Sequence, residues 1–175
     1  WVKRSAATAI REVAKHTPEL AQLIVNAGGV GAMVDYVSEA RDNARLPGIM
    51  TLGYISAFSE TLALATIVSK SVPPLVNALV TEPEDHIKSA AAWSLGQIGR
   101  HTPDHAKALA DANALPVLLG VYLHDSSSED LKGKAKRALK AVVRKCIHLP
   151  ALEPLLHDAT AEILAYLVGQ VPQVP

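Results

Sequence analysis

Apolar side chains recur at spacings of three and four residues along most of the chain, and whole stretches of this pattern repeat. In residues 2–18, Ala6, Ile10 and Val13 fall on one side of a helix with 3.6 residues per turn. Residues 87–103 carry the same pattern and end in the same tripeptide, His-Thr-Pro. We therefore predict that the chain is built from repeated helical units.

Two weaker copies of the pattern set its period. Leu52 follows Ile10 by 42 residues, and Leu139 follows Leu95 by 44. A helical period in the low forties is typical of α-solenoids, in which each unit buries its apolar face against its neighbours. Because the first helical stretch matches the third helix of a unit, we expect a fragment of a longer array. The expected organisation is one domain of about four units, roughly 1–43, 44–86, 87–130 and 131–175.

Proline and glycine indicate where the helices of each unit begin and end. Thr17-Pro18 and Thr102-Pro103 combine an N-cap residue with a proline in the first helical turn. Gly28 can adopt the left-handed conformation that ends many helices. These signals give three helices per unit, which predicts an all-α, right-handed α-solenoid of armadillo repeats.

Composition fits such a fold and limits the possible partners. The 175 residues are 49% apolar but only 4% aromatic, so small aliphatic side chains must fill the interior. Lys plus Arg equals Asp plus Glu at 17 each, which gives no overall attraction to nucleic acid or to an anionic membrane. No apolar run approaches the roughly 20 residues of a membrane span. We expect a soluble cytoplasmic protein with no nucleic-acid or membrane partner.

Four stretches of the chain resemble one family of armadillo proteins. They are Arg-Leu-Pro-Gly-Ile-Met at 45–50, Glu-Pro-Glu-Asp-His-Ile-Lys at 82–88, Ala-Ala-Ala-Trp-Ser-Leu-Gly-Gln-Ile-Gly-Arg-His-Thr-Pro at 90–103, and Leu-Pro-Ala-Leu-Glu-Pro at 149–154. With the repeat phase, they make the chain similar to the later repeats of the sperm-associated antigen six family, the armadillo proteins of the axonemal central apparatus.

The resemblance implies a function that the repeat pattern alone does not. It implies a non-enzymatic scaffold in the cytoskeleton of cilia or flagella, associated with microtubules and needed for motility. The implied partners are other central-apparatus proteins, with tubulin as a further candidate.

The third helices of stacked armadillo units are expected to line a concave groove. Trp93 and Tyr54 could anchor a partner there, because aromatic side chains bury a large area at low entropic cost, or they could pack between units. Both interpretations stay open. Repeat alignment places these candidate protein-binding residues on the groove: Met50, Tyr54, Trp93, Gln97, Arg100, Arg137 and Arg144.

A groove ligand would differ from the cargo of nuclear-import carriers. Armadillo carriers of basic localisation peptides use a repeated Trp with an Asn four residues later, whereas here the pair occurs once, as Trp93 and Gln97. Basic residues such as Arg100 and Arg137 also replace the acidic groove residues of those carriers. An alternative function is nevertheless a soluble transport or signalling adaptor that binds another extended peptide in the groove.

The segment 131–145 has seven basic residues and no acidic one. Its positive face could bind an acidic segment, such as the carboxyl-terminal tails of tubulin, or could be an ordinary solvated helix surface. The candidate basic patch consists of Lys132, Lys136, Lys140 and Lys145. The predicted buried stripe of the same helix consists of Leu131, Ala135, Ala138, Leu139 and Val142.

We find no pattern that indicates catalysis or metal binding. His101 and His105 are four residues apart, but Thr102-Pro103 separates them, and the position of His101 before Thr-Pro indicates a role in the turn. The lone Cys146 is expected to be a small core residue. Glu82, Glu84 and Asp85 are expected to cluster at a helix start. We expect no enzyme activity, no cofactor and no small-molecule substrate.

Overall fold

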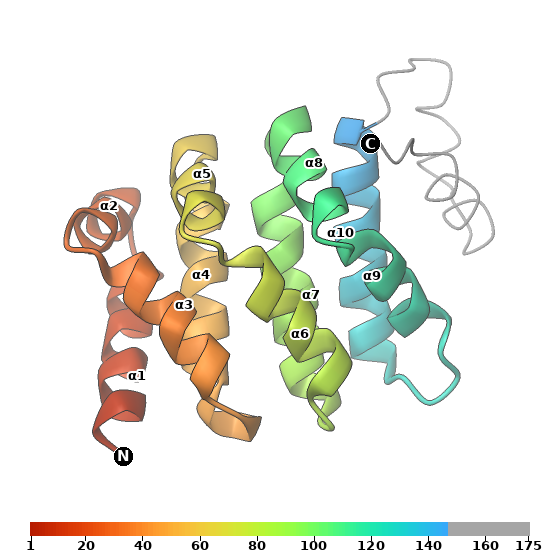
Figure 1. Cartoon of the computed structure of the whole chain (residues 1–175), viewed down its shortest axis with the longest axis horizontal. Helices are drawn as coiled ribbons and strands as arrows, with labels where there is room; N and C mark the ends of the chain where they lie inside the picture. Colours follow the sequence, from red (N-terminus) through yellow and green to blue (C-terminus); the bar gives the residue numbers. More distant parts are fainter. Residues whose placement is uncertain (147–175) are drawn as a thin grey trace.

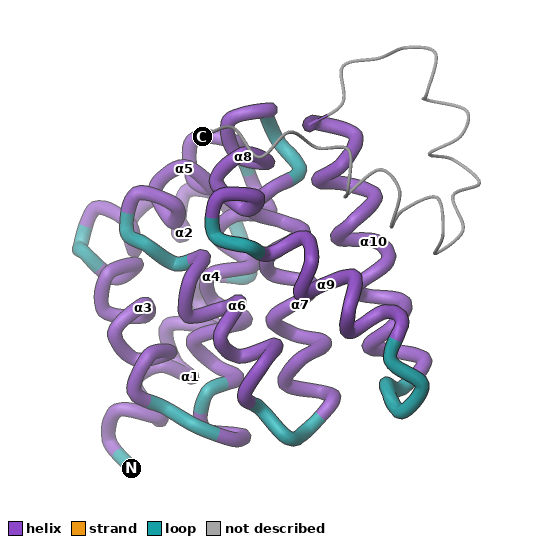
Figure 2. Tube along the Cα trace, turned by 45° about the vertical axis from the view of Figure 1, so that its right-hand side comes forward, coloured by secondary structure: helices purple, strands orange, loops and turns teal. Residues whose placement is uncertain are grey.

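The computed structural model describes residues 1–146, which form α-helices joined by short connections. Figure 2 shows helices and loops, and no strand, in this part of the chain. The elements are α1 (Val2–Ala14), α2 (Pro18–Asn26), α3 (Gly29–Glu39), the 3-10 helix η1 (Asp42–Ala44), α4 (Leu46–Phe58), α5 (Glu60–Val68), α6 (Val72–Thr81), α7 (Asp85–Gly99), α8 (Pro103–Asp111), α9 (Ala114–Leu123) and α10 (Glu129–Cys146).

The longer helices α1, α4, α7 and α10 lie side by side and form one layer of the molecule (Figure 1). α4 packs against α1 and α7, and α10 packs against α7. Two shorter helices follow each of the first three, and the second of them crosses over the layer in Figure 1. This order of one long and two short helices confirms the predicted all-α solenoid of three-helix units.

Part of the predicted last unit lies outside the described residues. The side chain of Cys146 and the stretch 149–154 are in that part of the chain, so the expectations about them are not addressed by the structure.

Local sequence signals place the start of each first short helix. The hydroxyl oxygens of Thr17, Ser59 and Thr102 each accept a hydrogen bond, 3.2 Å long, from the backbone N–H three residues later. Each therefore satisfies one of the N–H groups that a helix start leaves unpaired. Gly28, between α2 and α3, has a φ of +76°, which confirms the left-handed turn expected there.

Small residues let the long helices approach one another closely. A Cβ atom built on Gly96 of α7 would lie 3.1 Å from the Cα of Ala138 of α10. Between α4 and α7, the buried hydroxyl of Ser94 donates a 2.9 Å hydrogen bond to the carbonyl of Ile49. The predicted apolar stripe of α10 is confirmed, because Leu131, Ala135, Ala138, Leu139 and Val142 are all buried.

The prediction that Glu82 clusters with Glu84 and Asp85 at a helix start is wrong, because Glu82 caps the end of α6. Its side chain is buried and forms a 2.9 Å ion pair with the equally buried Arg45. The same guanidinium donates to the carbonyl of Val37 at 2.8 Å and to that of Pro74 at 3.1 Å. Arg45 thus joins α3, the start of α4 and α6 around one buried charge. Asp85 does lie in the first turn of α7, as predicted.

No single helix among those described is both long and apolar enough to cross a membrane. The pairs α2–α3, α5–α6 and α8–α9 reach that length and composition only across bends of 81°, 76° and 75°. Among residues 1–146, no three side chains of the metal-binding types come together as a ligand set.

Candidate protein-binding site

A shallow hollow of about 280 Å³ lies between α7 and α10. From α7 it is lined by Trp93, Gly96, Gln97 and Arg100. From α10 it is lined by Lys134, Arg137, Ala138 and Ala141. Within each helix the successive spacings are three, one and three residues, so the four residues share one face.

The floor of the hollow is made by small residues and its walls by long ones. Gly96 and Ala138 bring the two backbones together. Trp93 and Gln97 line one side, and the long side chains of Lys134 and Arg137 line the other. A ligand group entering here would meet an aromatic ring, a side-chain amide and cations within one small volume.

Trp93 also contacts the preceding long helix. Its ring packs edge-on against Tyr54 of α4, with ring centroids 5.3 Å apart and an angle of 68° between the planes. Both side chains are partly buried, as is that of Met50 one turn earlier on α4. The structure therefore shows the packing role of Trp93, and because the same ring lines the hollow, its role as an anchor for a partner stays a prediction.

Three cationic side chains line the hollow without a carboxylate among its lining residues. Arg100 donates to the carbonyl of Ala57 at 2.6 Å, and Arg137 donates to that of Gly133 at 3.2 Å. Within residues 1–146, neither arginine nor Lys134 forms an ion pair. The positive charge of the hollow is thus not neutralised by the described part of the chain.

The corresponding region of α1 is different, because it contains a carboxylate that pairs with its cations. Glu12 accepts from the guanidinium of Arg11 at 2.6 Å and forms a second ion pair with Lys15. Hydrogen bonds from Lys15 and Arg11 hold the pKa of the Glu12 carboxyl below its ordinary value. The unneutralised positive charge is therefore a property of the α7–α10 hollow and not of every long helix.

The structure brings together four of the predicted groove residues in this hollow: Trp93, Gln97, Arg100 and Arg137. Arg144 is exposed further along α10 and is not part of the lining. Sequence reasoning missed Lys134 as a groove residue. Its signal was its position three residues before Arg137 and seven before Ala141, which is the spacing of one helix face.

The candidate basic patch does not coincide with the hollow. Lys132, Lys136 and Lys140 follow one row along α10 and are partly buried. Lys145 is five residues beyond Lys140, so it is turned by about 140° around the helix axis. None of the four lines the hollow.

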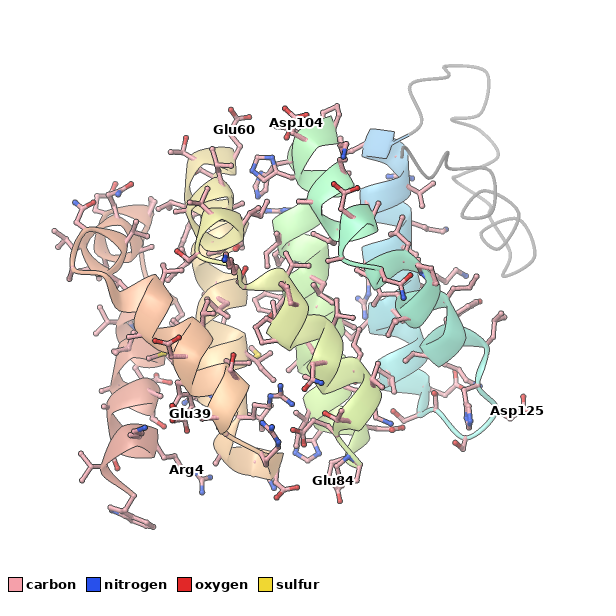
Figure 3. All side chains as sticks on the ribbon, viewed as in Figure 1. Arg4, Glu39, Glu60, Glu84, Asp104 and Asp125 are labelled. Carbon is pink, nitrogen blue, oxygen red and sulfur yellow. The ribbon has the colours of Figure 1, made fainter. Side chains whose placement is uncertain are left out.

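Two histidines, His101 just after α7 and His105 in the first turn of α8, form contacts with the preceding unit. Nε2 of His101 lies 2.7 Å from the carbonyl oxygen of Ser56, and Nε2 of His105 lies 2.9 Å from that of Glu60. Burial lowers the pKa of the His101 ring. Figure 3 shows Glu60 and Asp104 at this edge of the stack, where α5 and α8 begin. His101 therefore has a structural role, and this role includes a contact between two units as well as its place in the turn.

Comparison with known proteins places this geometry in context, although no family model matches the chain. Human sperm-associated antigen 6 is 60% identical to it over 102 residues, which cover 58% of this chain and 20% of that protein. Mouse sperm-associated antigen 6 gives the same identity and coverage. The matched region is thus about one fifth of the length of these relatives.

Solved structures with the same architecture include designed armadillo repeat proteins. One of them, YIII(Dq.V1)4CPAF in complex with the peptide (KR)4, has a TM-score of 0.74 at 22% identity and covers 94% of this chain and 71% of its own. Another, YIII(Dq)4CqI, has a TM-score of 0.75 at 21% identity, with coverage of 94% and 72%. The chain is therefore an armadillo-repeat α-solenoid, similar over 102 of its residues to sperm-associated antigen 6.

Proposed function

We propose that this chain is part of a non-enzymatic protein-interaction scaffold in the central apparatus of ciliary or flagellar axonemes. The observation that carries the proposal is the 60% identity to sperm-associated antigen 6 over 102 residues. The matched proteins are about five times longer than the aligned region, so the proposal concerns the contribution of this segment to a larger assembly.

The site chemistry supports recognition of another protein. The α7–α10 hollow combines Trp93, Gln97 and Arg137, and interface anchors are enriched in Trp and Arg. The hollow is small and lies on an extended layer of long helices, so a partner that enters it can contact several units at once. We propose other central-apparatus proteins as these partners, with tubulin as a second candidate.

Fractionation of ciliated cells tests this proposal. Axonemes are demembranated with detergent and washed, and the protein is followed by antibody. A scaffold component stays with the axonemal pellet, and chemical crosslinks from its lysines lead to central-apparatus proteins. Complete release into the detergent supernatant, with no axonemal crosslink, contradicts the proposal.

The alternative function is a soluble adaptor that binds an extended peptide on the long-helix layer. One observation favours it: a designed armadillo protein of the same architecture is described in complex with the peptide (KR)4. The cations of this chain's hollow disfavour so basic a peptide, because like charges repel. In the fractionation experiment, release of the protein into the supernatant is the result expected for an adaptor.

A further inference from the structure

We infer that the α7–α10 hollow binds an acidic linear segment of a partner protein, whose carboxylates pair with Arg137, Lys134 and Arg100. This inference rests on the proposed scaffold function and names the chemistry of the partner. The ligand that we infer has an apolar or aromatic residue about three residues away from its acidic ones.

Charge is the first reason. Arg100, Lys134 and Arg137 line one hollow and form no ion pair with any residue among 1–146. Bringing three cations together costs free energy through mutual repulsion, and carboxylates beside them lower that cost. Arginine also offers paired N–H donors that match the two oxygens of a carboxylate.

The two arginines are already held in place by the backbone. Arg100 is tied to the carbonyl of Ala57 on α4, and Arg137 to the carbonyl of Gly133 one turn earlier on α10. Each of these bonds uses one N–H group of a guanidinium that has five. The remaining donors are available to a ligand, and less conformational entropy is lost because the side chains are partly fixed.

The neighbouring row of the layer supplies the apolar part of the site. Met50 and Tyr54 of α4 are partly exposed, and Tyr54 packs against Trp93 at the edge of the hollow. A ligand that leaves the hollow toward α4 therefore passes from cations to an aromatic surface. Toward α1 a carboxylate enters the row, because Glu12 forms ion pairs with Arg11 and Lys15.

The spacing of the ligand residues follows from the spacing of the helices. Packed helices lie about 8–10 Å apart, and an extended chain rises about 3.3 Å per residue. About three ligand residues therefore separate a side chain on the α4 row from a side chain in the α7–α10 hollow. The amide of Gln97 lies between them and can bond the ligand backbone.

Peptide binding to the 175-residue chain tests the inference. The probe is a fluorescein-labelled twelve-residue peptide with three consecutive Glu residues and one Phe three positions away, prepared in both sequence orders. Control peptides replace Glu by Gln, Phe by Ala, or Glu by Lys. Affinity is measured by fluorescence anisotropy over a salt series, since a charge-driven complex weakens as salt screens it.

Two double variants on α10 separate the hollow from the general charge of the helix. Lys134→Gln with Arg137→Gln removes two charges from the hollow, and Lys132→Gln with Lys136→Gln removes two charges outside it. We expect the first to weaken binding of the Glu peptide by at least about tenfold and the second by less than about twofold. Circular dichroism checks that both variants keep their helix content.

A variant of Trp93 tests the aromatic part of the site separately. Trp93→Leu should weaken the affinity for the Phe-containing peptide by several-fold and have a smaller effect on the affinity for its Phe→Ala control, because only the first peptide contacts the Trp93 ring through an aromatic side chain.

Three results would overturn the inference. They are equal weakening by both double variants, equal affinity for the Glu and Gln peptides, and displacement of the Glu peptide by a single-stranded oligonucleotide that binds more tightly. Retention of the protein in axonemes would still support the scaffold function in any of these cases, so the two proposals can fail separately.

Discussion

At the scale of single residues, the contact between α4 and α7 requires a residue without a side chain, Gly53. A Cβ atom on Gly53 would overlap the ring of Trp93 and the hydroxyl of Ser94. Because Trp93 is also held by Tyr54, it cannot turn aside without losing that contact. Gly53 therefore sets how closely the two long helices approach and where the Trp93 ring lies.

Replacing Gly53 by alanine should destabilise the fold. We expect a loss of about 1–3 kcal/mol from overpacking, in spite of the better helix propensity of alanine. Gly120→Ala is the matched control, because Gly120 lies in α9 with nothing within 4 Å of its added Cβ. That variant should gain up to about 1 kcal/mol. Urea unfolding of both measures the difference, and equal effects would contradict this account of Gly53.

His101 should make stability depend on pH. Burial lowers its pKa below the ordinary 6.5, with smaller effects from the neighbouring charges of Arg100 and His105, while the bond to Ser56 and the charge of Glu60 act the other way. The folded chain therefore favours the neutral ring. The contribution of neutral His101 to the stability of the fold is complete above about pH 6.5. It is lost as the pH falls through the lowered pKa, because His101 binds its proton more readily in the unfolded chain.

Thermal unfolding between about pH 5 and pH 8 measures this effect. His101→Gln should flatten the decline in midpoint on the acid side, since glutamine can still donate to the carbonyl of Ser56. His16→Gln, at an exposed ring, should leave the decline as it is. An unchanged slope in the first variant would exclude His101 as its source.

Residue-level prediction from the sequence worked where the cause was local. Thr17 and Thr102 cap helices because a hydroxyl three residues ahead of an N–H group is a local arrangement. Arg45 and Glu82 were missed as a pair because they are 37 residues apart and meet only after three helices have packed. No local pattern distinguishes a buried Glu from its exposed neighbour Glu84.

At the scale of helices, Arg45 fixes the position of α4 relative to α3 and α6. It lies just before α4, and its guanidinium bonds the carbonyls of Val37 and Pro74 as well as the carboxylate of Glu82. Val37 lies in α3 of the preceding unit, whereas Pro74 and Glu82 belong to the same unit as α4, so these bonds link two neighbouring units. The pair therefore orients three helices that apolar contacts alone would allow to slide.

Removing Arg45 should have a large effect. We expect Arg45→Met to destabilise the chain by about 3–5 kcal/mol, because it leaves the buried carboxylate of Glu82 without its cationic partner and with only the backbone N–H of Asp42. Lys3→Met breaks an exposed ion pair with Glu39 and should have a much smaller effect, because solvent screens that pair. Chemical denaturation compares the two. A small loss for Arg45→Met would show that the buried pair does not orient these helices.

The outer face of α5 differs from those of its counterparts. Leu64 and Val68 are 49% and 72% exposed, whereas the equivalent positions, counted from the N-cap, hold polar pairs in α2 and α8. These pairs are Gln22 with Asn26, bonded at 2.8 Å, and Lys107 with Asp111, bonded at 2.7 Å. The two apolar side chains are thus not required by the repeat.

Copying the α2 pair into α5 should leave stability nearly unchanged. Leu64→Gln with Val68→Asn alters only exposed side chains, so we expect a change within about 0.5 kcal/mol per site. Differential scanning calorimetry is a suitable measurement. A marked loss would mean that Leu64 or Val68 is part of the core after all.

The helices themselves were predictable, and their contacts were only partly so. Thr-Pro pairs and Gly28 mark helix ends through backbone chemistry, so three helices per unit could be predicted from the sequence. Repeat alignment then placed Trp93 and Arg137 in one site, because equivalent residues of stacked units lie side by side. Lys134 was missed because Lys132, Lys136 and Lys140, at four-residue spacing, indicate a different face of the helix.

At the scale of the whole molecule, residues far apart in sequence form one continuous surface. Tyr54, Gln97 and Ala141 are separated by 43 and 44 residues, and each lies on a long helix of the same layer. The surface changes in character along the stack, from paired charges on α1 through aromatic rings on α4 and α7 to cations on α10. The repeats thus share a fold while each presents different chemistry to a partner.

Amide chemical shifts of the isotope-labelled chain, recorded during titration with the Glu peptide, test this account most directly. We predict that Tyr54, Gln97 and Ala141 shift together at one affinity, while Leu64 and Val68 on the outer face of α5 keep their positions. Shifts confined to the short outer helices, or spread evenly over the chain, would contradict both the continuous long-helix surface and the acidic ligand of the α7–α10 hollow.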